Sequence, residues 1–364
     1  MLPLDATTLD VATREPTPRA PSRPIAPATG GGLATDDAPP LHLPGAHFAL
    51  ALAALVLGAA GLVWGAPEIA RGEMFAPHVL AIVHLFTLGW ITTSILGALC
   101  QFLPVAVGTP IRSQRAAYLT LVLHGGGLAL FVGGLLAGSA VVFRTGAILV
   151  VVALASFALN LALTLARSSQ RDVTFWALVL ADTFLVATLT LGALLAWNLH
   201  TGAVLGAARI EWLAVHVHVA LAGWVLMVMV GVAHRLLPMF LLSHGASERP
   251  AQVAIALLAL GSALLVLPLC HGGLHQTWVA GGGCLALGVG AFLAQAASFV
   301  RHRRRRAIDP GMKLALAGLG WLAVTVIVAP FAVGRGFGEP RLLVAYVFLA
   351  IVAAISTFVA GHYY

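Results

Sequence analysis

Apolar runs of about 20 residues recur along the chain, separated by short segments that carry Gly, Pro or Arg. A helix of that length spans about 30 Å, the thickness of a bilayer's hydrocarbon core. Because the core holds no water, backbone groups must bond internally, and a helix does so within one segment. The pattern therefore predicts an all-α polytopic membrane protein. The about ten expected transmembrane helices lie near 46–65, 75–104, 116–138, 142–166, 174–198, 210–240, 250–270, 278–300, 313–333 and 341–362.

Composition supports a lipid bilayer as the main partner. Hydrophobic residues make up 60% of the chain and charged residues only 9%, against about 25% charged in a soluble domain. The net charge of +7 comes largely from the loop 301–313 beside a span, so it does not indicate nucleic-acid binding. Cys100, Cys270 and Cys284 form no CxxC or zinc spacing, so we expect neither a disulfide framework nor a thiol redox motif.

The polar ends of the spans predict an orientation. Residues 1–44 are rich in Pro, Ala, Thr and Gly, and we expect a disordered cytoplasmic tail without a cleaved signal peptide. With this tail inside, 15 of the 20 Lys and Arg residues lie on the inner side. Basic residues are enriched in cytoplasmic loops. We therefore expect an integral membrane protein, of a bacterial inner membrane, with both termini cytoplasmic.

An internal repeat is the most informative feature. Two spans share a motif whose members are all displaced by 134 positions: His84, Gly89, Trp90, Gly97, Leu103 and Pro104 match His218, Gly223, Trp224, Gly231, Leu237 and Pro238. A weaker echo relates Phe157 and Asn160 to Phe292 and Gln295. The repeating unit is then four helices, and an even number of spans makes the units parallel.

The repeat divides the chain into units. We expect the first four-helix unit at 45–170, the second at 171–308 and a partial third at 309–364. Matching Gly361 to Gly97 and Gly231 places Phe348 at the histidine position of the third unit. The repeated glycines are eight residues apart and suit close helix packing, and the prolines are expected to end or kink the spans.

Packing does not explain a histidine in both copies of the motif. Ionisable groups inside a membrane usually mark function, and imidazole is a common ligand of haem iron and copper. His84 and His218 should lie at equal depth, where they would clamp one planar cofactor while Gly89 and Gly223 leave room for it. The alternative is that both rings bond to neighbouring helices.

Other ionisable residues are weaker candidates. His216, His271 and His275 are possible metal ligands, the last two at the end of a span where a loop facing water is their simpler location. Asp182 and His124 each lie about 12 Å deep, at about 1.5 Å per residue, and are candidates for a proton path or for pairing with each other.

The repeated four-helix units with histidines on spans two and six resemble subunit I of the haem–copper oxidase superfamily. The segment from Gly97 to Pro104 is similar to the end of the second helix in its nitric oxide reductase branch. The resemblance covers about 46–364. It implies that His84 ligates a low-spin haem and that His218 or His216 ligates copper beside a high-spin haem, with a pair at the end of span seven.

The chain departs from that family's pattern at span seven and from span ten onward. It has no adjacent histidine pair, no histidine in the outer half of span ten and no last two spans. These departures favour a single haem or metal site over a complete site for oxygen or nitric oxide reduction. Whether the protein is an oxidoreductase is not decided by the sequence. The first hypothesis is thus a haem- or copper-binding protein of respiratory electron transfer or nitric oxide metabolism, with an electron-donor protein or another respiratory subunit as partner. A transporter without metal and a cofactor-less assembly subunit are the alternatives.

Overall fold

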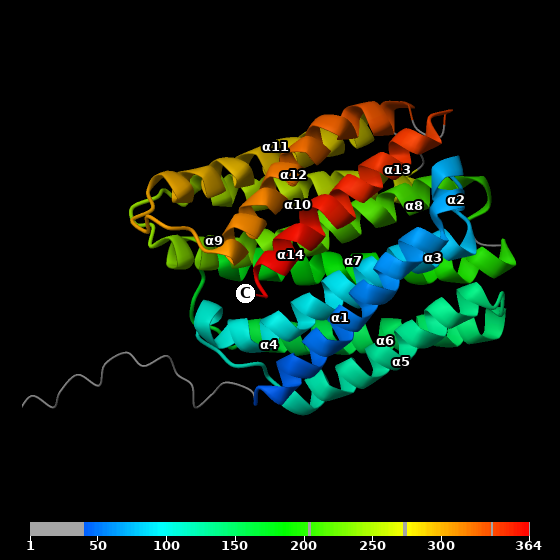
Figure 1. The fold of residues 1–364 in the computed structure, drawn as a ribbon, viewed down its shortest axis with the longest axis horizontal. Helices are drawn as coiled ribbons and strands as arrows, with labels where there is room; N and C mark the ends of the chain where they lie inside the picture. Colours follow the sequence, from blue (N-terminus) through cyan, green and yellow to red (C-terminus); the bar gives the residue numbers. More distant parts are fainter. Residues whose placement is uncertain (1–39, 203–204, 272–274, 336–337, 364) are drawn as a thin grey trace, which may run out of the picture. The chain divides into compact units, whose positions relative to one another are not determined.

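A computed structural model describes residues 40–363 apart from 203–204, 272–274 and 336–337, all within one compact unit. Within these residues, ten helices are long and apolar enough to cross a membrane, and no strand is present (Figure 1). The expected fold class is confirmed. The spans are α1 (His42–Trp64), α3–η2–α4 (Pro77–Val107), α5 (Gln114–Leu136), α6 (Ala140–Leu165), α7 (Val173–Thr201), α8–η4–α9 (Arg209–Leu241), α10 (Arg249–His271), α11 (His275–Arg301), α12 (Pro310–Arg335) and α13–η6–α14 (Pro340–Gly361).

Several spans begin and end where the sequence supplies the required groups. The side chains of Ser113 and Asp172 accept hydrogen bonds from backbone N–H groups in the first turns of α5 and α7, at 3.1 and 2.9 Å. Such caps satisfy donors that the helix itself leaves unpaired. Gly108 and Gly202 follow α4 and α7 with φ of 65° and 62°, a conformation that glycine adopts without strain.

Three spans contain a π-helical segment, in which hydrogen bonds skip one more residue than in an α-helix. The segments are η2 (Leu85–Thr92), η4 (Val219–Leu226) and η6 (Leu349–Ser356). From Leu85 to Val219 is 134 positions, and from Val219 to Leu349 is 130. The sequence motif recurs at these same displacements, so the backbone carries the repeat too. Single π turns are often found at functional sites.

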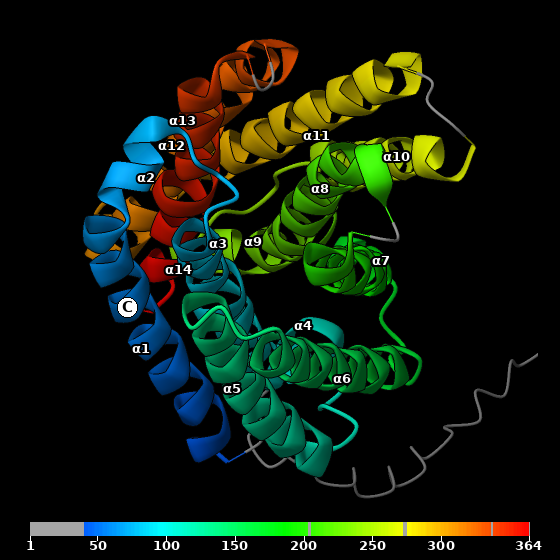
Figure 2. The same cartoon turned by 90° about the vertical axis from the view of Figure 1, so that its right-hand side faces the viewer.

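Within each unit the second span packs closely on the first. A Cβ added at Gly89 would lie 2.5 Å from the Cβ of Ala54 in α1, and one at Gly231 would lie 2.9 Å from that of Ala177 in α7. Gly361 approaches the backbone of α12 in the same way. Spans two and six are more buried than most and lie toward the middle of the bundle (Figure 2).

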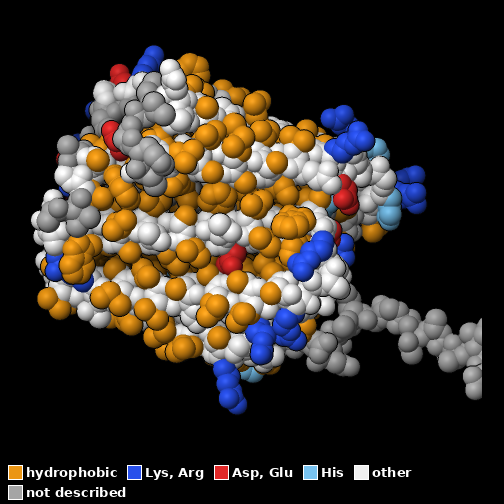
Figure 3. Space-filling view, turned by 180° about the vertical axis from the view of Figure 1, so that it is seen from behind, with side chains coloured by type: hydrophobic (Ala, Val, Ile, Leu, Met, Phe, Trp, Pro, Cys, Tyr) orange, Lys and Arg blue, Asp and Glu red, His pale blue; other side chains and the backbone are white. Residues whose placement is uncertain are grey.

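The outer surface is apolar in the way a bilayer requires. Large hydrophobic side chains are exposed along most spans, among them Val122, Ile148 and Leu287. Figure 3 shows hydrophobic side chains over the middle of one face, with Lys and Arg gathered toward its ends. A contiguous apolar surface of this extent marks contact with lipid. The chain is an integral membrane protein.

Two local expectations need correction. Residues 66–71, expected as loop, form the short helix α2 (Ala66–Arg71) with proline in its first turn, a favoured position. Pro104 and Pro238 end neither span, because α4 continues to Val107 and α9 to Leu241. The expected disordered tail lies almost wholly outside the described residues.

Candidate cofactor site

A cavity of about 300 Å³ lies between the spans of the first unit and those that begin the second. Its wall comes from α3 and η2, α5, α6, α7, and α8 with η4. Along span six it extends from Arg209 to Val225, about 24 Å at 1.5 Å per residue. Most of the wall is hydrocarbon, and its few polar groups include His84, His216 and Arg209.

His84 stands in this wall with one ring nitrogen free to bind. Its Nδ1 lies 2.7 Å from the carbonyl oxygen of Leu80, one turn back in the same helix. A carbonyl only accepts, so Nδ1 carries the proton and the lone pair of Nε2 is available. The ring also packs on Phe131, with centroids 4.8 Å apart. A hydrogen bond from the other ring nitrogen to a backbone carbonyl is typical of metal-ligating histidines.

His216 lines the same cavity from span six. Its ring lies over Gly192 of α7, where an added Cβ would come 3.0 Å from the ring carbon Cε1. His84 lines the same cavity from span two. The cavity thus brings together imidazoles from two different units.

Three buried polar atoms on the cavity wall have no hydrogen-bond partner among the described residues. They are Nδ1 of His216, Oγ1 of Thr188 and Nε1 of Trp224. Leaving a buried donor or acceptor unpaired costs about 1–3 kcal/mol. The residues line the cavity, but protein atoms cover these three polar atoms, so each is unpaired inside the packed wall.

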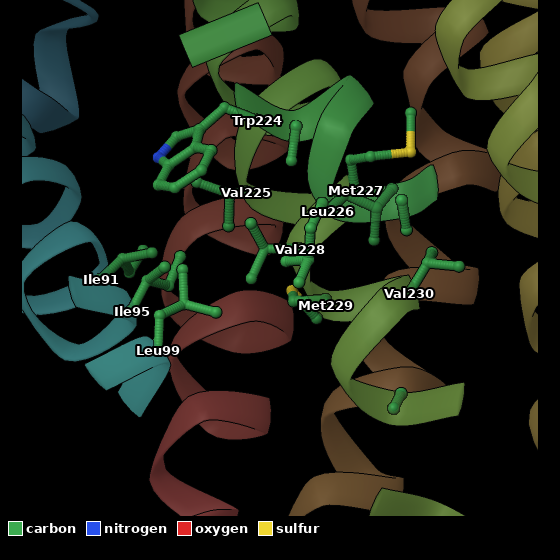
Figure 4. Close-up of a cluster of buried hydrophobic side chains, with 14 of the residues drawn as sticks. Ile91, Ile95, Leu99, Trp224, Val225, Leu226, Met227, Val228, Met229 and Val230 are labelled. Carbon is green, nitrogen blue, oxygen red and sulfur yellow. The ribbon is translucent and has the colours of Figure 1, made fainter. Parts of the chain in front are cut away.

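The end of the cavity beside η2 and η4 is closed by tightly packed hydrocarbon. Trp224 and Val225 of η4 line it, as does Ile91 of η2. Figure 4 shows these side chains beside Ile95 and Leu99 of span two, with the indole nitrogen of Trp224 turned away from Met227. The cluster is almost completely buried. This floor therefore separates the cavity from the polar surface beyond it.

The opposite end is polar and exposed. The guanidinium carbon of Arg209 lies 5.4 Å from the ring centroid of Phe75, and both side chains reach the surface. A cation over an aromatic face is favourable by about 0.5–1 kcal/mol at an exposed site. An occupant with an acidic group at this end would meet the fixed positive charge of Arg209.

His218 is not part of the cavity wall. Its Nδ1 donates to the carbonyl of Ala214 at 2.8 Å, as His84 does to Leu80. The remaining nitrogen, Nε2, therefore accepts from the hydroxyl of Tyr346 in span ten, at 3.2 Å. The cavity therefore has His84 and His216 in its wall, and the expected pairing of His84 with His218 is not seen there.

The glycines are packing positions. A Cβ at Gly223 would lie 2.8 Å from the ring of Phe184, and Gly89 faces Ala54 and Leu128. Neither glycine lines the cavity. The expectation that they make room for a flat cofactor is wrong, because neighbouring helices take that space.

Asp182 and His124 lie apart from the cavity and are not partners. Nε2 of His124 is 3.1 Å from both the carbonyl oxygen of Leu88 and Oγ1 of Thr93. Oδ1 of Asp182 is buried and has no hydrogen-bond partner among the described residues. Their expected pairing is not present, and a proton path through them stays a prediction.

A multi-ligand metal centre is not formed by the part of the chain that the structure describes. No three His, Cys, Asp or Glu side chains there come close enough to hold an ion. His271 and His275 are placed at the ends of α10 and α11, but their side chains lie outside the described residues. The expected copper ligands are therefore not brought together by any described contact.

Comparison with known proteins does not assign the chain to a family. No protein-family profile and no curated protein matches the sequence. The evidence for the candidate site therefore comes only from the residues and geometry of this chain. Sequence reasoning missed Thr188, Gly192 and Arg209, which belong to no motif, although Trp224 was a member of the repeat.

Proposed function

We propose that the chain is a membrane haem protein that holds one haem in this cavity between His84 and His216. The observation that carries the proposal is the pair of imidazoles on one cavity wall, one of them already oriented by a backbone hydrogen bond. Histidine nitrogen is a common axial ligand of haem iron. The imidazoles come from spans two and six, so binding would also tie the first unit to the second.

The surroundings suit this cofactor. The cavity volume falls at the lower end of the range of about 300–1,000 Å³ for small-molecule sites, and its wall is apolar with few polar groups. Arg209 at the exposed end offers a cation for acidic substituents, while the floor of Ile91 and Trp224 excludes water. A bound haem would supply one-electron chemistry, with a potential set by its ligands and by burial.

The role we infer is respiratory electron transfer or nitric oxide metabolism, as the resemblance to the oxidase subunit I superfamily implies. His84 keeps the role that the resemblance gave it, and His216 takes the place of the second axial ligand. Copper has less support, because no group of three suitable ligands is found among the described side chains. An electron donor would have to approach the exposed end of the cavity, near Arg209.

The transport alternative depends on different residues. A substrate path would need polar side chains inside the bundle. The candidates are Asp182, His124, Asn160 and Gln295, and none of them lines the cavity. Asn160 instead bonds both backbone groups of Ser113 at 2.9 Å, which fixes the loop before α5. We therefore give the haem proposal precedence over a substrate path.

The test is a reduced-minus-oxidised absorbance spectrum of the full chain, expressed with haem supply and purified in mild detergent. We expect a Soret band, α and β bands on reduction, and about one iron per chain by metal analysis. Folded protein without a Soret band would overturn the proposal. Iron-free protein containing copper would favour the copper reading.

A further inference from the structure

The three π segments allow corresponding positions of the three units to be identified by counting residues from the start of each segment. One residue before each segment stand His84, His218 and Phe348. Three residues before each segment stand Ile82, His216 and Tyr346. We call these the near and the far position of a unit. Each unit therefore offers one near and one far side chain to its neighbours.

The candidate haem site joins the near position of one unit to the far position of the next. His84 is the near residue of the first unit, and His216 is the far residue of the second. Both line the same cavity. If the units are related by a repeated rotation, the same relation should join the second unit to the third.

The structure shows a contact between the near residue of the second unit and the far residue of the third. His218, the near residue of the second unit, contacts Tyr346, the far residue of the third. The hydroxyl oxygen lies 3.2 Å from Nε2, and the rings stack with centroids 6.1 Å apart at 26°. The His218–Tyr346 contact is thus the repeat-related counterpart of the His84–His216 site.

The two counterparts differ in one residue. His84 and His218 are oriented alike, each donating from Nδ1 to the carbonyl four residues earlier, at 2.7 and 2.8 Å. In the first case Nε2 faces a cavity, and in the second it accepts from a phenol. A tyrosine side chain reaches further than a histidine and adds a hydroxyl donor. Tyr346 therefore occupies the lone pair of His218 that a metal would use.

We infer that Tyr346 closes a second copy of the histidine site and so limits the chain to one haem. The inference rests on the proposed function. It assigns His218 a structural bond to Tyr346 in the native chain, in spite of its place in the repeated motif. A third copy has no ligand at all, because Phe348 and Ile82 at its two positions are hydrocarbons.

The decisive variant is Tyr346→His, which recreates the near–far histidine pair of the first site. We expect the haem content of the purified full chain to rise from one to two per chain. In the double variant His84→Ala/Tyr346→His the content should return to one, now bound through His218. Haem is quantified against protein as its pyridine complex, with reduced-minus-oxidised spectra to separate the two sites.

Control variants keep the inference separate from the haem proposal. His218→Ala in the native chain should leave one haem, and Tyr346→Phe should also keep one, because it removes the hydroxyl but not the bulk. If Tyr346→His does not fold, Tyr346→Gly with added imidazole tests the same site by supplying the missing ligand in solution. The inference is overturned if folded Tyr346→His and imidazole-treated Tyr346→Gly each bind only one haem. It is also overturned if folded His218→Ala loses its haem. Neither result by itself contradicts haem binding between His84 and His216. A native chain that binds no haem refutes the proposed function instead.

Discussion

At the residue scale, what separates the histidines of the two middle spans is the partner of the second ring nitrogen. His84 and His218 share the bond to the preceding turn, but only His84 keeps a free nitrogen beside a cavity. His216 lines the same cavity, although its unpaired Nδ1 is covered by protein atoms. Availability of the lone pair, and not membership of the motif, decides which rings can hold a metal.

His84→Ala should abolish haem binding. The substitution removes the imidazole that is pre-oriented by Leu80, and no other described histidine can take its place on span two's side of the cavity. The measurement is haem per chain after purification. His78→Ala is the matched control, since His78 lies in the same helix, is half-exposed and contacts Trp64 instead of the cavity. Equal haem content in both variants would contradict the assignment.

Gly192→Val should weaken haem binding without touching either ligand. A Cβ at this position already comes 3.0 Å from the His216 ring, and a branched side chain would push that ring into the cavity. We expect haem to dissociate at least tenfold faster in transfer to a competing apoprotein. Gly133→Val, in α5 with no atom near its Cβ position, is the control. The same dissociation rate in both would show that His216 does not depend on this space.

The sequence could identify His84 and His216 as candidates because a histidine among apolar residues is conspicuous. It could not choose between His216 and His218, which differ by two positions and therefore point in different directions around the helix. The sequence could not identify Gly192 and Thr188 as site residues, because glycine and threonine are common in membrane spans for packing alone. Only the neighbouring ring of His216 gives Gly192 its role.

At the element scale, glycines set how closely the second span of a unit approaches the first. Gly89 meets Ala54 and Gly231 meets Ala177 at distances that exclude any side chain. In a membrane, where apolar side chains gain little from leaving lipid, this close packing is a main source of association. The motif therefore has a packing function in its glycines, and the proposed haem site would add a ligand function in His84.

Gly89→Ala should destabilise the bundle by about 1–3 kcal/mol, the usual cost of overpacking. The added methyl would lie 2.5 Å from the Cβ of Ala54, so α1 or η2 must shift. Thermal unfolding in detergent, followed by the loss of helical circular dichroism, measures the effect. Gly126→Ala serves as control, because nothing lies near its Cβ position. An unchanged midpoint for Gly89→Ala would refute close packing at this contact.

The ten spans were predictable from hydrophobic length alone, while the π segments were not. Their residues are as apolar as the α-helical turns beside them, so hydropathy carries no signal for one extra residue per turn. The fixed displacement of 134 positions, however, did predict that spans two and six are corresponding helices of two parallel units. The hydrogen bond from Thr93 to the carbonyl of Leu88, five residues earlier, follows from the π geometry.

At the scale of the whole molecule, basic residues gather at one end of the bundle. Arg301, the last residue of α11, and residues 303–306 beyond it are exposed. The backbone N–H groups of Arg304 and Arg305 donate to the carbonyls of Leu242 and Leu241 at 3.3 Å. This links the loop after α9 to the loop after α11. By the enrichment of basic residues in cytoplasmic loops, we expect this end to face the cytoplasm.

Single added cysteines test that orientation. A membrane-impermeant thiol reagent should label Ala137→Cys, in the turn after α5, in intact cells. Ser247→Cys, in the turn before α10, should be labelled only after the membrane is made permeable. Both positions are exposed, and the unmodified chain gives the background from its own cysteines. The reversed pattern would place the basic loops outside and the mouth of the cavity inside.

The most direct test of the account is the electron paramagnetic resonance spectrum of the oxidised, haem-loaded protein. Two imidazole ligands give low-spin ferric iron, so we expect a low-spin signal in the native chain. The signal should become high-spin in His216→Ala and stay low-spin in His218→Ala. A high-spin native spectrum, or a low-spin signal lost with His218 and kept without His216, would contradict a haem held between His84 and His216.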